Sequence, residues 1–175
     1  MLEREPDSIA RQAFVRLADR ELHRAYRLAG LILGNAHDAE DATQDALVRA
    51  WAASSSLHSW DDFQAWFDRI LVNLCRDRLR RRRLVSFVPM AGEYDKPDGD
   101  QFQRVIAQDE LLRAMSVLDA DLRTVVVLRY WADLTVDAIA QRVGVPSGTV
   151  KSRLNRALGL MRDAVLDAGR PEGSK

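Results

Sequence analysis

A cluster of hydroxyl, amide and cationic side chains near the end of the chain carries the clearest chemical signal. Lys151, Ser152, Asn155 and Arg156 are spaced i, i+1, i+4 and i+5, so on a helix they share one face. Lysine and arginine bind guanine and phosphate, and an asparagine amide can read adenine in the major groove of DNA. A basic solvent face would have the same composition. We favour a DNA-reading surface because the flanking sequence supports it.

The elements that would position this face form a helix-turn-helix pattern over residues 134–154. A short first helix, capped by Thr135, buries Ile139 and Ala140. Gly144 permits the positive φ that the tight turn needs. The second helix carries one apolar stripe, formed by Val150, Leu154, Ala157, Leu158 and Met161. Turn, stripe and polar face agree, so the pattern favours a recognition helix over a plain helical hairpin.

The charges of the chain are strongly segregated although they sum to zero, with 26 Lys and Arg residues against 26 Asp and Glu residues. Residues 69–83 hold seven arginines against one acid, and residues 142–162 hold five cations and no acid. Residues 35–62 and 84–110 each hold six acids, against one and two cations. Two basic blocks separated by acidic ones indicate two polyanion-binding surfaces. Solvated helix faces are the ordinary alternative, but two such blocks favour nucleic acid.

Composition excludes several other classes of protein. A chain of 175 residues that is 47% hydrophobic is too apolar for a disordered protein, yet it contains no apolar run long enough to span a membrane. The single cysteine, Cys75, excludes an internal disulfide and a cysteine-based zinc site, and the three histidines are not at metal-ligand spacing. We therefore expect no metal and no cofactor, and we expect Cys75 to be a small packing residue.

The sequence also indicates whether the protein is an enzyme and where in the cell it works. No nucleophile–base pair and no phosphate-binding glycine loop is visible, so an enzyme is the weakest interpretation. No secretory signal is visible among the first residues, so we expect a cytoplasmic protein.

The periodicity of apolar residues predicts an all-α protein made of two small helical domains joined by a flexible linker. Residues 1–83 form three helices, broken at Gly34-Asn35 and at the serines of residues 54–56, with the third helix from 62 to about 83. Residues 84–104 hold two prolines and two glycines among acids and predict the linker. Residues 105–168 form the second domain, which contains the helix-turn-helix, and residues 169–175 form a tail. Three tryptophans are expected in the core: Trp51, Trp66 and Trp131.

Three segments, in this order, resemble the extracytoplasmic-function (ECF, group 4) sigma factors, of the sigma-70 class of bacterial RNA polymerase. Residues 38–51 (DAEDATQDALVRAW) resemble the helix of that family that binds core polymerase. Residues 63–81 (FQAWFDRILVNLCRDRLRR) resemble its −10-element helix, and residues 139–157 resemble its −35-binding domain. The resemblance implies an alternative sigma factor that binds core polymerase, recognises both promoter elements and promotes DNA melting.

The resemblance also assigns contact residues and partners. The residues that would dock on the β′ clamp helices of core polymerase share one helix face: Asp41, Gln44 and Asp45. Those that would hold the −10 element are Trp60, Asn73, Arg76, Arg80 and Arg83. Those that would hold the −35 element are Ser147, Thr149, Lys151, Ser152, Arg153, Asn155 and Arg156. The implied partners are core RNA polymerase (through its β′ and β subunits), promoter DNA and an anti-sigma factor, with no membrane and no small-molecule substrate.

Two other functions remain open. A stand-alone helix-turn-helix regulator would use the same recognition helix without any polymerase contact, and it would be expected to dimerise on paired half-sites. A decoy that mimics a sigma factor in order to titrate an anti-sigma factor would not need the cations and the amide of the recognition face.

Overall fold

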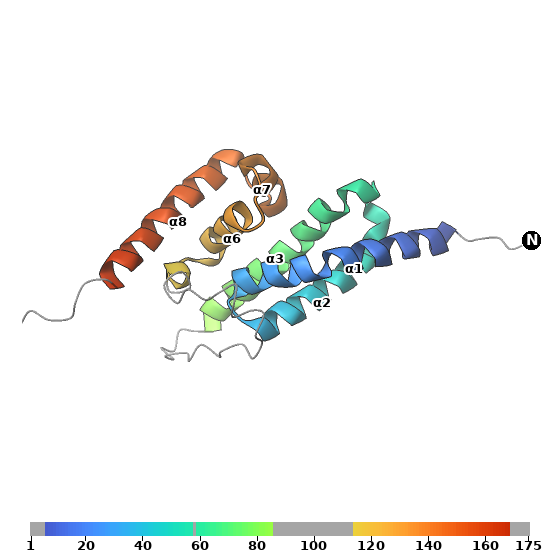
Figure 1. Cartoon of the computed structure of the whole chain (residues 1–175), viewed down its shortest axis with the longest axis horizontal. Helices are drawn as coiled ribbons and strands as arrows, with labels where there is room; N and C mark the ends of the chain where they lie inside the picture. Colours follow the sequence, from blue (N-terminus) through green and yellow to red (C-terminus); the bar gives the residue numbers. More distant parts are fainter. Residues whose placement is uncertain (1–5, 58, 86–113, 169–175) are drawn as a thin grey trace, which may run out of the picture.

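The computed structural model describes residues 6–57, 59–85 and 114–168, and within these ranges every regular element is helical (Figure 1). The predicted all-α class is therefore confirmed, with two helical domains joined by a linker. Residues 86–104 of the predicted linker lie outside the described residues, as does most of the helix expected to begin near residue 105. No helix in the described ranges is both long and apolar enough to cross a bilayer.

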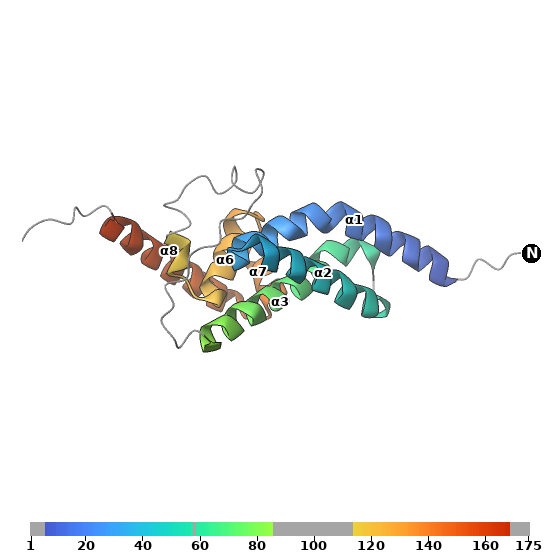
Figure 2. The same cartoon turned by 90° about the horizontal axis from the view of Figure 1, so that it is seen from below.

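The first domain begins with two long helices, α1 (Pro6–Leu33) and α2 (Ala36–Ala52). They separate where the sequence predicted a break. Gly34 has a φ of 70°, and the Asn35 side chain accepts a hydrogen bond from the backbone N–H of Asp38 at 2.9 Å, which caps α2. The fully buried apolar residues of α2 are all small: Ala39, Ala42, Ala46 and Ala50. Small side chains let the two helices pack closely along their length (Figures 1 and 2).

The third long helix, α3 (Phe63–Val85), follows two single 3₁₀ turns, η1 (Ser54–Ser56) and η2 (Trp60–Asp62). It ends two residues beyond the predicted boundary, within the usual uncertainty of helix ends. Phe63, Phe67 and Leu71 are fully buried, as the apolar spacing predicted. The rings of Phe63 and Phe67 stack with centroids 5.7 Å apart, so aromatic packing fixes the start of α3 in the core.

None of the three tryptophans expected in the core is fully buried: Trp66 is half-buried against the core, and for Trp51 and Trp131 the prediction was wrong. Trp51 is 42% exposed and Trp131 is 36% exposed. Trp51 sits in the last turn of α2, where its ring packs edge-on against Phe14 and the Arg11 guanidinium lies over the ring. A tryptophan at the end of a helix can thus cover the core with one edge and still face solvent.

The second domain contains α6 (Ala120–Tyr130), α7 (Val136–Val143) and α8 (Ser147–Ala168). Asp119 caps α6 by accepting a hydrogen bond from the N–H of Leu122 at 2.8 Å. Thr135 caps α7 as predicted, and Gly144 adopts the left-handed conformation with a φ of 70°. The turn chemistry predicted for a helix-turn-helix is therefore present.

The two domains pack against each other, with α6 and α7 of the second domain placed between α8 and α3 (Figure 1). Helix α6 contacts α1 and α3, and α7 contacts α3. Buried side chains of both domains belong to one hydrophobic cluster, which includes Leu33 and Val72 of the first domain and Leu122 and Val143 of the second. The arginine-rich helix α3 therefore has the helix-turn-helix against one of its sides.

Candidate nucleic-acid interface

The predicted reading face of α8 is open to solvent. Lys151, Ser152, Asn155 and Arg156 are all exposed, and they stand on the side of α8 opposite to its buried residues. That buried side consists of Val150, Leu154 and Ala157. Leu158, which was predicted to continue the stripe, is 42% exposed, although Ala157 before it is fully buried and Met161 after it packs against the core. The helix-turn-helix thus presents three kinds of donor and acceptor on one accessible surface.

The other three residues predicted for this surface lie at the start of α8 or point towards α6. Ser147 begins α8, and its hydroxyl donates a 2.5 Å hydrogen bond to the carboxylate of Asp137 on α7, which ties the two helices of the motif together. Thr149 is half-buried, and its carbonyl accepts a hydrogen bond from the Ser152 hydroxyl at 2.9 Å. Arg153 points away from the reading face: its Nη2 atom lies 2.9 Å from Oδ2 of Asp121.

The arginines of α3 differ sharply in their surroundings. Arg80 and Asn73 are exposed, whereas Arg76 is only 8% exposed and faces α6 and α7. Arg76 donates to Asp121 at 2.9 Å, to the backbone carbonyl of Val143 at 3.1 Å and to the side-chain oxygen of Asn73 at 3.4 Å. The side chain of Arg83 lies outside the described residues. The surface of α3 predicted to hold the −10 element is therefore partly occupied by the second domain.

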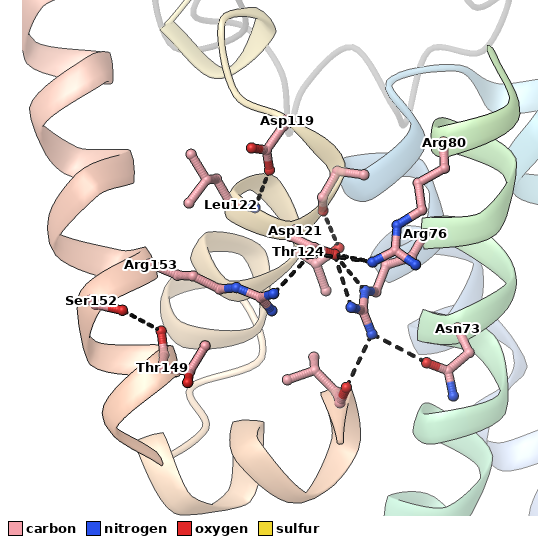
Figure 3. Close-up of polar contacts among 12 residues, drawn as sticks. Asn73, Arg76, Arg80, Asp119, Asp121, Leu122, Thr124, Thr149, Ser152 and Arg153 are labelled. Carbon is pink, nitrogen blue, oxygen red and sulfur yellow. Dashed lines mark hydrogen bonds and ion pairs between the residues drawn. The ribbon is translucent and has the colours of Figure 1, made fainter. Parts of the chain in front are cut away.

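Asp121, in the first turn of α6, is the centre of this contact (Figure 3). Arg76 and Arg80 reach it from α3 and Arg153 reaches it from α8, each at 2.9 Å. Burial alone would raise the pKa of Asp121, but the hydrogen bond and charge of Arg76, with the charges of Arg153 and Arg80, lower it below its ordinary value. The carboxylate is thus ionised throughout the physiological pH range.

A second carboxylate, this one fully buried, joins the same two domains. Asp68 on α3 is fully buried and accepts hydrogen bonds from Arg24 of α1 at 2.5 Å and from Arg142 of α7 at 3.2 Å. Arg24 also contacts Glu21 at 2.6 Å, and these carboxylates raise the pKa of Arg24 although its burial opposes that shift. Sequence reasoning missed both Asp68 and Asp121 as contact residues, because each has partners more than 30 positions away.

Trp60 lies just before the start of α3, whereas Asn73 lies near the middle of that helix. Trp60 is half-buried in η2, where its ring stacks on Phe63 with centroids 6.4 Å apart. Asn73 is ten residues further along the helix than Phe63, which is about 15 Å at the rise of an α-helix. The structure does not bring these two predicted −10 residues together, so they could contact nucleic acid only at separate points.

The acidic face predicted on α2 is present and accessible. The side chains of Asp41 and Asp45 are 47% and 53% exposed, and both face Arg78 on α3, at 3.7 and 2.6 Å. Gln44 is exposed between them, with its amide nitrogen 3.5 Å from the carboxylate of Glu40. Two carboxylates and an amide therefore form one surface that can accept hydrogen bonds from a basic partner.

The described residues give little support for metal binding or for thiol chemistry. Within them, no three His, Cys, Asp or Glu side chains meet in an arrangement that could hold a metal ion. Cys75 is fully buried, and burial raises its pKa to about 12 against an opposing effect from Arg78. The thiol is therefore protonated and shielded at neutral pH.

Two protein families match the chain, one for each domain. The first is described as sigma-70 region 2 and matches residues 17–85, which contain the acidic face of α2 and the basic helix α3. The second is described as sigma-70, region 4, and matches residues 108–161, which contain the helix-turn-helix.

Curated relatives match across most of the chain. The ECF RNA polymerase sigma factor SigM of Mycobacterium tuberculosis is 35% identical over 147 residues, covering 84% of this chain and 74% of the relative. SigW of Bacillus subtilis is 29% identical over 170 residues, covering 89% and 90%. SigE of Mycolicibacterium smegmatis is 32% identical over 163 residues, and there the match spans only 63% of the relative's length.

Two solved structures share the fold. The sigma factor RpoE of Bartonella quintana, in complex with the anti-sigma factor NepR, has a TM-score of 0.66 and 25% identity over 90% of this chain and 98% of that one. CnrH, in complex with the cytosolic domain of CnrY, has a TM-score of 0.58 and 28% identity over 92% and 96%. Each match covers both domains of the chain.

Proposed function

Because this chain belongs to the ECF family of sigma-70 RNA polymerase sigma factors, we propose that it is an alternative sigma factor, in group 4 of that class, which directs core RNA polymerase to a set of promoters. The observation that carries the proposal is the pairing of two exposed surfaces on one chain. One is the reading face of α8, and the other is the acidic face of α2. A DNA-binding regulator needs only the first, whereas a factor that delivers polymerase to DNA needs both.

The reading face of α8 would bind the −35 element in the major groove. Arg156 and Lys151 supply donors for guanine or phosphate, and Asn155 supplies an amide that can pair with adenine. Ser147 and Thr149, at the start of α8, are placed to contact the phosphate backbone, as helix N-termini often do. Each phosphate that the protein neutralises steepens the log–log salt dependence of binding by about 0.9.

Helix α3 would bind the −10 element as melted DNA. Arg80 and Asn73 are exposed on it, and Trp60 offers an aromatic ring at its start. Cations that follow the phosphates and an aromatic ring that stacks on a base are the usual means of holding a single strand. Promoter opening would then be driven by binding alone, since unstacking a base costs a few kcal/mol that the new contacts offset. No catalytic step is needed, and we assign the chain no enzymatic role.

The acidic face of α2 would dock on a basic surface of core polymerase, which we place at the clamp helices of the β′ subunit. Asp41, Gln44 and Asp45 offer acceptors for lysine and arginine donors there, and such complementarity gives fast, salt-sensitive association. A protein that works on polymerase and chromosomal DNA in a bacterium functions in the cytoplasm.

An anti-sigma factor is the regulatory partner that we propose. RpoE and CnrH, which share the fold of this chain, were solved with an anti-sigma factor and with the cytosolic domain of CnrY, respectively. We propose that such a partner would wedge between the two domains of this chain or clamp them, as the family resemblance implies.

Size-exclusion chromatography with purified core polymerase tests this function against its alternatives. We expect the chain to co-elute with core polymerase as a 1:1 complex and to lose this complex at high salt. Separate elution, together with dimeric binding to palindromic duplex DNA, would instead identify a stand-alone regulator. Binding to neither polymerase nor DNA would identify a decoy for an anti-sigma factor.

A further inference from the structure

The surface of α3 that we assign to the −10 element is in contact with the second domain of the same chain. Arg76, which is buried, donates to Asp121 on α6 and to the carbonyl of Val143 on α7. Arg80 is exposed, but its guanidinium also contacts Asp121, at 2.9 and 3.2 Å. The groups that would hold DNA phosphates are therefore held by a carboxylate instead.

The charges at this contact do not balance. Three guanidinium groups, from Arg76, Arg80 and Arg153, converge on the single carboxylate of Asp121 (Figure 3). These four groups together carry an excess of two positive charges. In addition, Nη1 of Arg153 is buried with no hydrogen-bond partner in the described residues. A nucleic-acid backbone offers several phosphates in place of one carboxylate, so Arg76 and Arg80 of α3 can each pair with a phosphate of their own instead of sharing Asp121.

Contacts outside this cluster hold the domains together as well. Arg142 of α7 donates to the fully buried Asp68 of α3, and the guanidinium of Arg123 on α6 lies 3.4 Å from the carbonyl of Ile32 on α1. Breaking a buried ion pair leaves a desolvated charge behind, which is costly. Asp68 keeps its second partner, Arg24, when Arg142 departs, so this contact can open without leaving the carboxylate unpaired.

The contact between the two domains covers residues of one proposed DNA-binding surface but not those of the other. Arg76 is buried by it, whereas Lys151, Asn155 and Arg156 on α8 remain exposed. The closed arrangement therefore covers part of the −10 surface and leaves the −35 surface accessible.

We propose that Asp121 occupies, in the free chain, the arginines that DNA phosphates take at the −10 element, so that the domains must separate before α3 can bind melted DNA. The closed chain can still bind a −35 element through α8. This inference rests on the DNA-binding role proposed above for α3. Asp121 then acts as an internal competitor of DNA, and the apparent affinity for single-stranded DNA is reduced by the fraction of chains that are closed.

The test compares Asp121→Asn with the full-length wild-type chain. The matched control is Asp133→Asn, which removes the same charge from an exposed loop residue of the same domain. Its φ of 49° is one that asparagine tolerates. Donor and acceptor dyes on Gln64→Cys of α3 and Asp163→Cys of α8, both exposed positions, report the separation of the domains. Binding is measured with a fluorescein-labelled 20-nucleotide single-stranded DNA of random sequence.

We expect Asp121→Asn to lower the energy transfer between the domains and to bind the single strand at least about fivefold more tightly, since opening removes the closed fraction. Asp133→Asn should resemble the wild type in both readouts. Unchanged energy transfer would overturn the inference, and so would domains that open without a gain in affinity.

A second variant, on α7, tests whether a gain in DNA affinity comes from separation of the domains or from a local change in α6. Arg142→Gln removes the contact with Asp68 together with one positive charge, so loss of a cation alone would weaken DNA binding, whereas opening would strengthen it. A gain in affinity supports the inference, and a loss overturns it. Co-elution with core polymerase should be unchanged in every variant, so its failure would count against the proposed function and not against this competition.

Discussion

Arg78 on α3 and Asp45 on α2 form a salt bridge, with Nη2 of the arginine 2.6 Å from Oδ2 of the carboxylate. The same guanidinium lies 3.7 Å from Asp41, so one arginine of the basic helix faces both carboxylates of the acidic helix. Neither carboxylate is buried by this contact. Arg78 thus contacts the two acids proposed to bind polymerase while both side chains stay about half exposed, and it links α2 to α3.

The first prediction concerns these acids. Asp41→Asn combined with Asp45→Asn should weaken binding to core polymerase by about tenfold or more, because hydrogen bonds to charged groups contribute about 1.5–3 kcal/mol each. Fluorescence anisotropy of the labelled chain titrated with core polymerase measures the change. The matched control is Asp163→Asn with Asp167→Asn, which removes two exposed charges from the end of α8. Equal affinity for both double variants would contradict a docking role for α2.

A second prediction separates base reading from phosphate contact on α8. Arg156→Ala should reduce discrimination at one position of the −35 element by about 1–3 kcal/mol, the usual contribution of a specific base contact. Selection of bound duplexes from a randomised library, before and after the substitution, measures it. Arg162→Ala on the same helix, with a side chain 74% exposed, is the control and should leave the selected motif unchanged. Uniform weakening on all sequences would make Arg156 a phosphate contact.

The helix-turn-helix could be predicted from sequence because its determinants are local. Thr135 caps α7, Gly144 takes a positive φ, and the buried residues Val150 and Leu154 recur at helical spacing. Each of these signals lies within a few residues of the structure that it specifies, and the same is true of the Gly34-Asn35 break and of the acidic face on α2.

The contacts between the domains could not be predicted in this way. The spacing of Arg76 indicated which side of α3 it occupies, but not that α6 and α7 cover that side. Asp121 stands in the first turn of α6, shortly after the capping residue Asp119, and nothing in its local sequence indicates contacts with α3 and α8. Arg153 belongs to a basic segment, yet its side chain turns inward to Asp121. Pairings between residues 30 or more positions apart leave no periodic trace in a single sequence.

A third prediction tests the turn of the helix-turn-helix. Gly144→Ala should destabilise the second domain by about 1–2 kcal/mol, because an L-residue in the left-handed conformation is strained by that amount. A Cβ atom at this position meets no atom within 4 Å, so the cost comes from the backbone alone. Urea denaturation followed by circular dichroism measures the free energy of unfolding.

The control for Gly144→Ala has the opposite sign. Gly159 lies inside α8, where a Cβ atom also meets nothing within 4 Å. Gly159→Ala should therefore stabilise the protein by about 0.5–1 kcal/mol, the helix-propensity difference between the two residues. Destabilisation by both substitutions would contradict the conformations assigned to these glycines.

A fourth prediction concerns Cys75, whose pKa burial raises to about 12 from an ordinary value of 9.0. The native thiol should not react with Ellman's reagent at pH 8, and it should react at once in denaturant. Because the unfolded chain ionises this thiol at lower pH than the folded one, its linkage leaves stability unchanged below about pH 9 and lowers it as the pH rises further. Rapid labelling of the native protein would place the thiol at the surface.

Transcription in vitro with purified core polymerase, the chain and a library of promoter fragments tests the central claim most directly. We predict that transcripts appear only when the chain and core polymerase are both present. They should start downstream of templates that share two conserved elements, the upstream one altered in specificity by Arg156→Ala. Absence of chain-dependent transcripts, with specific binding of the chain alone to the same library, would contradict the assignment as a sigma factor.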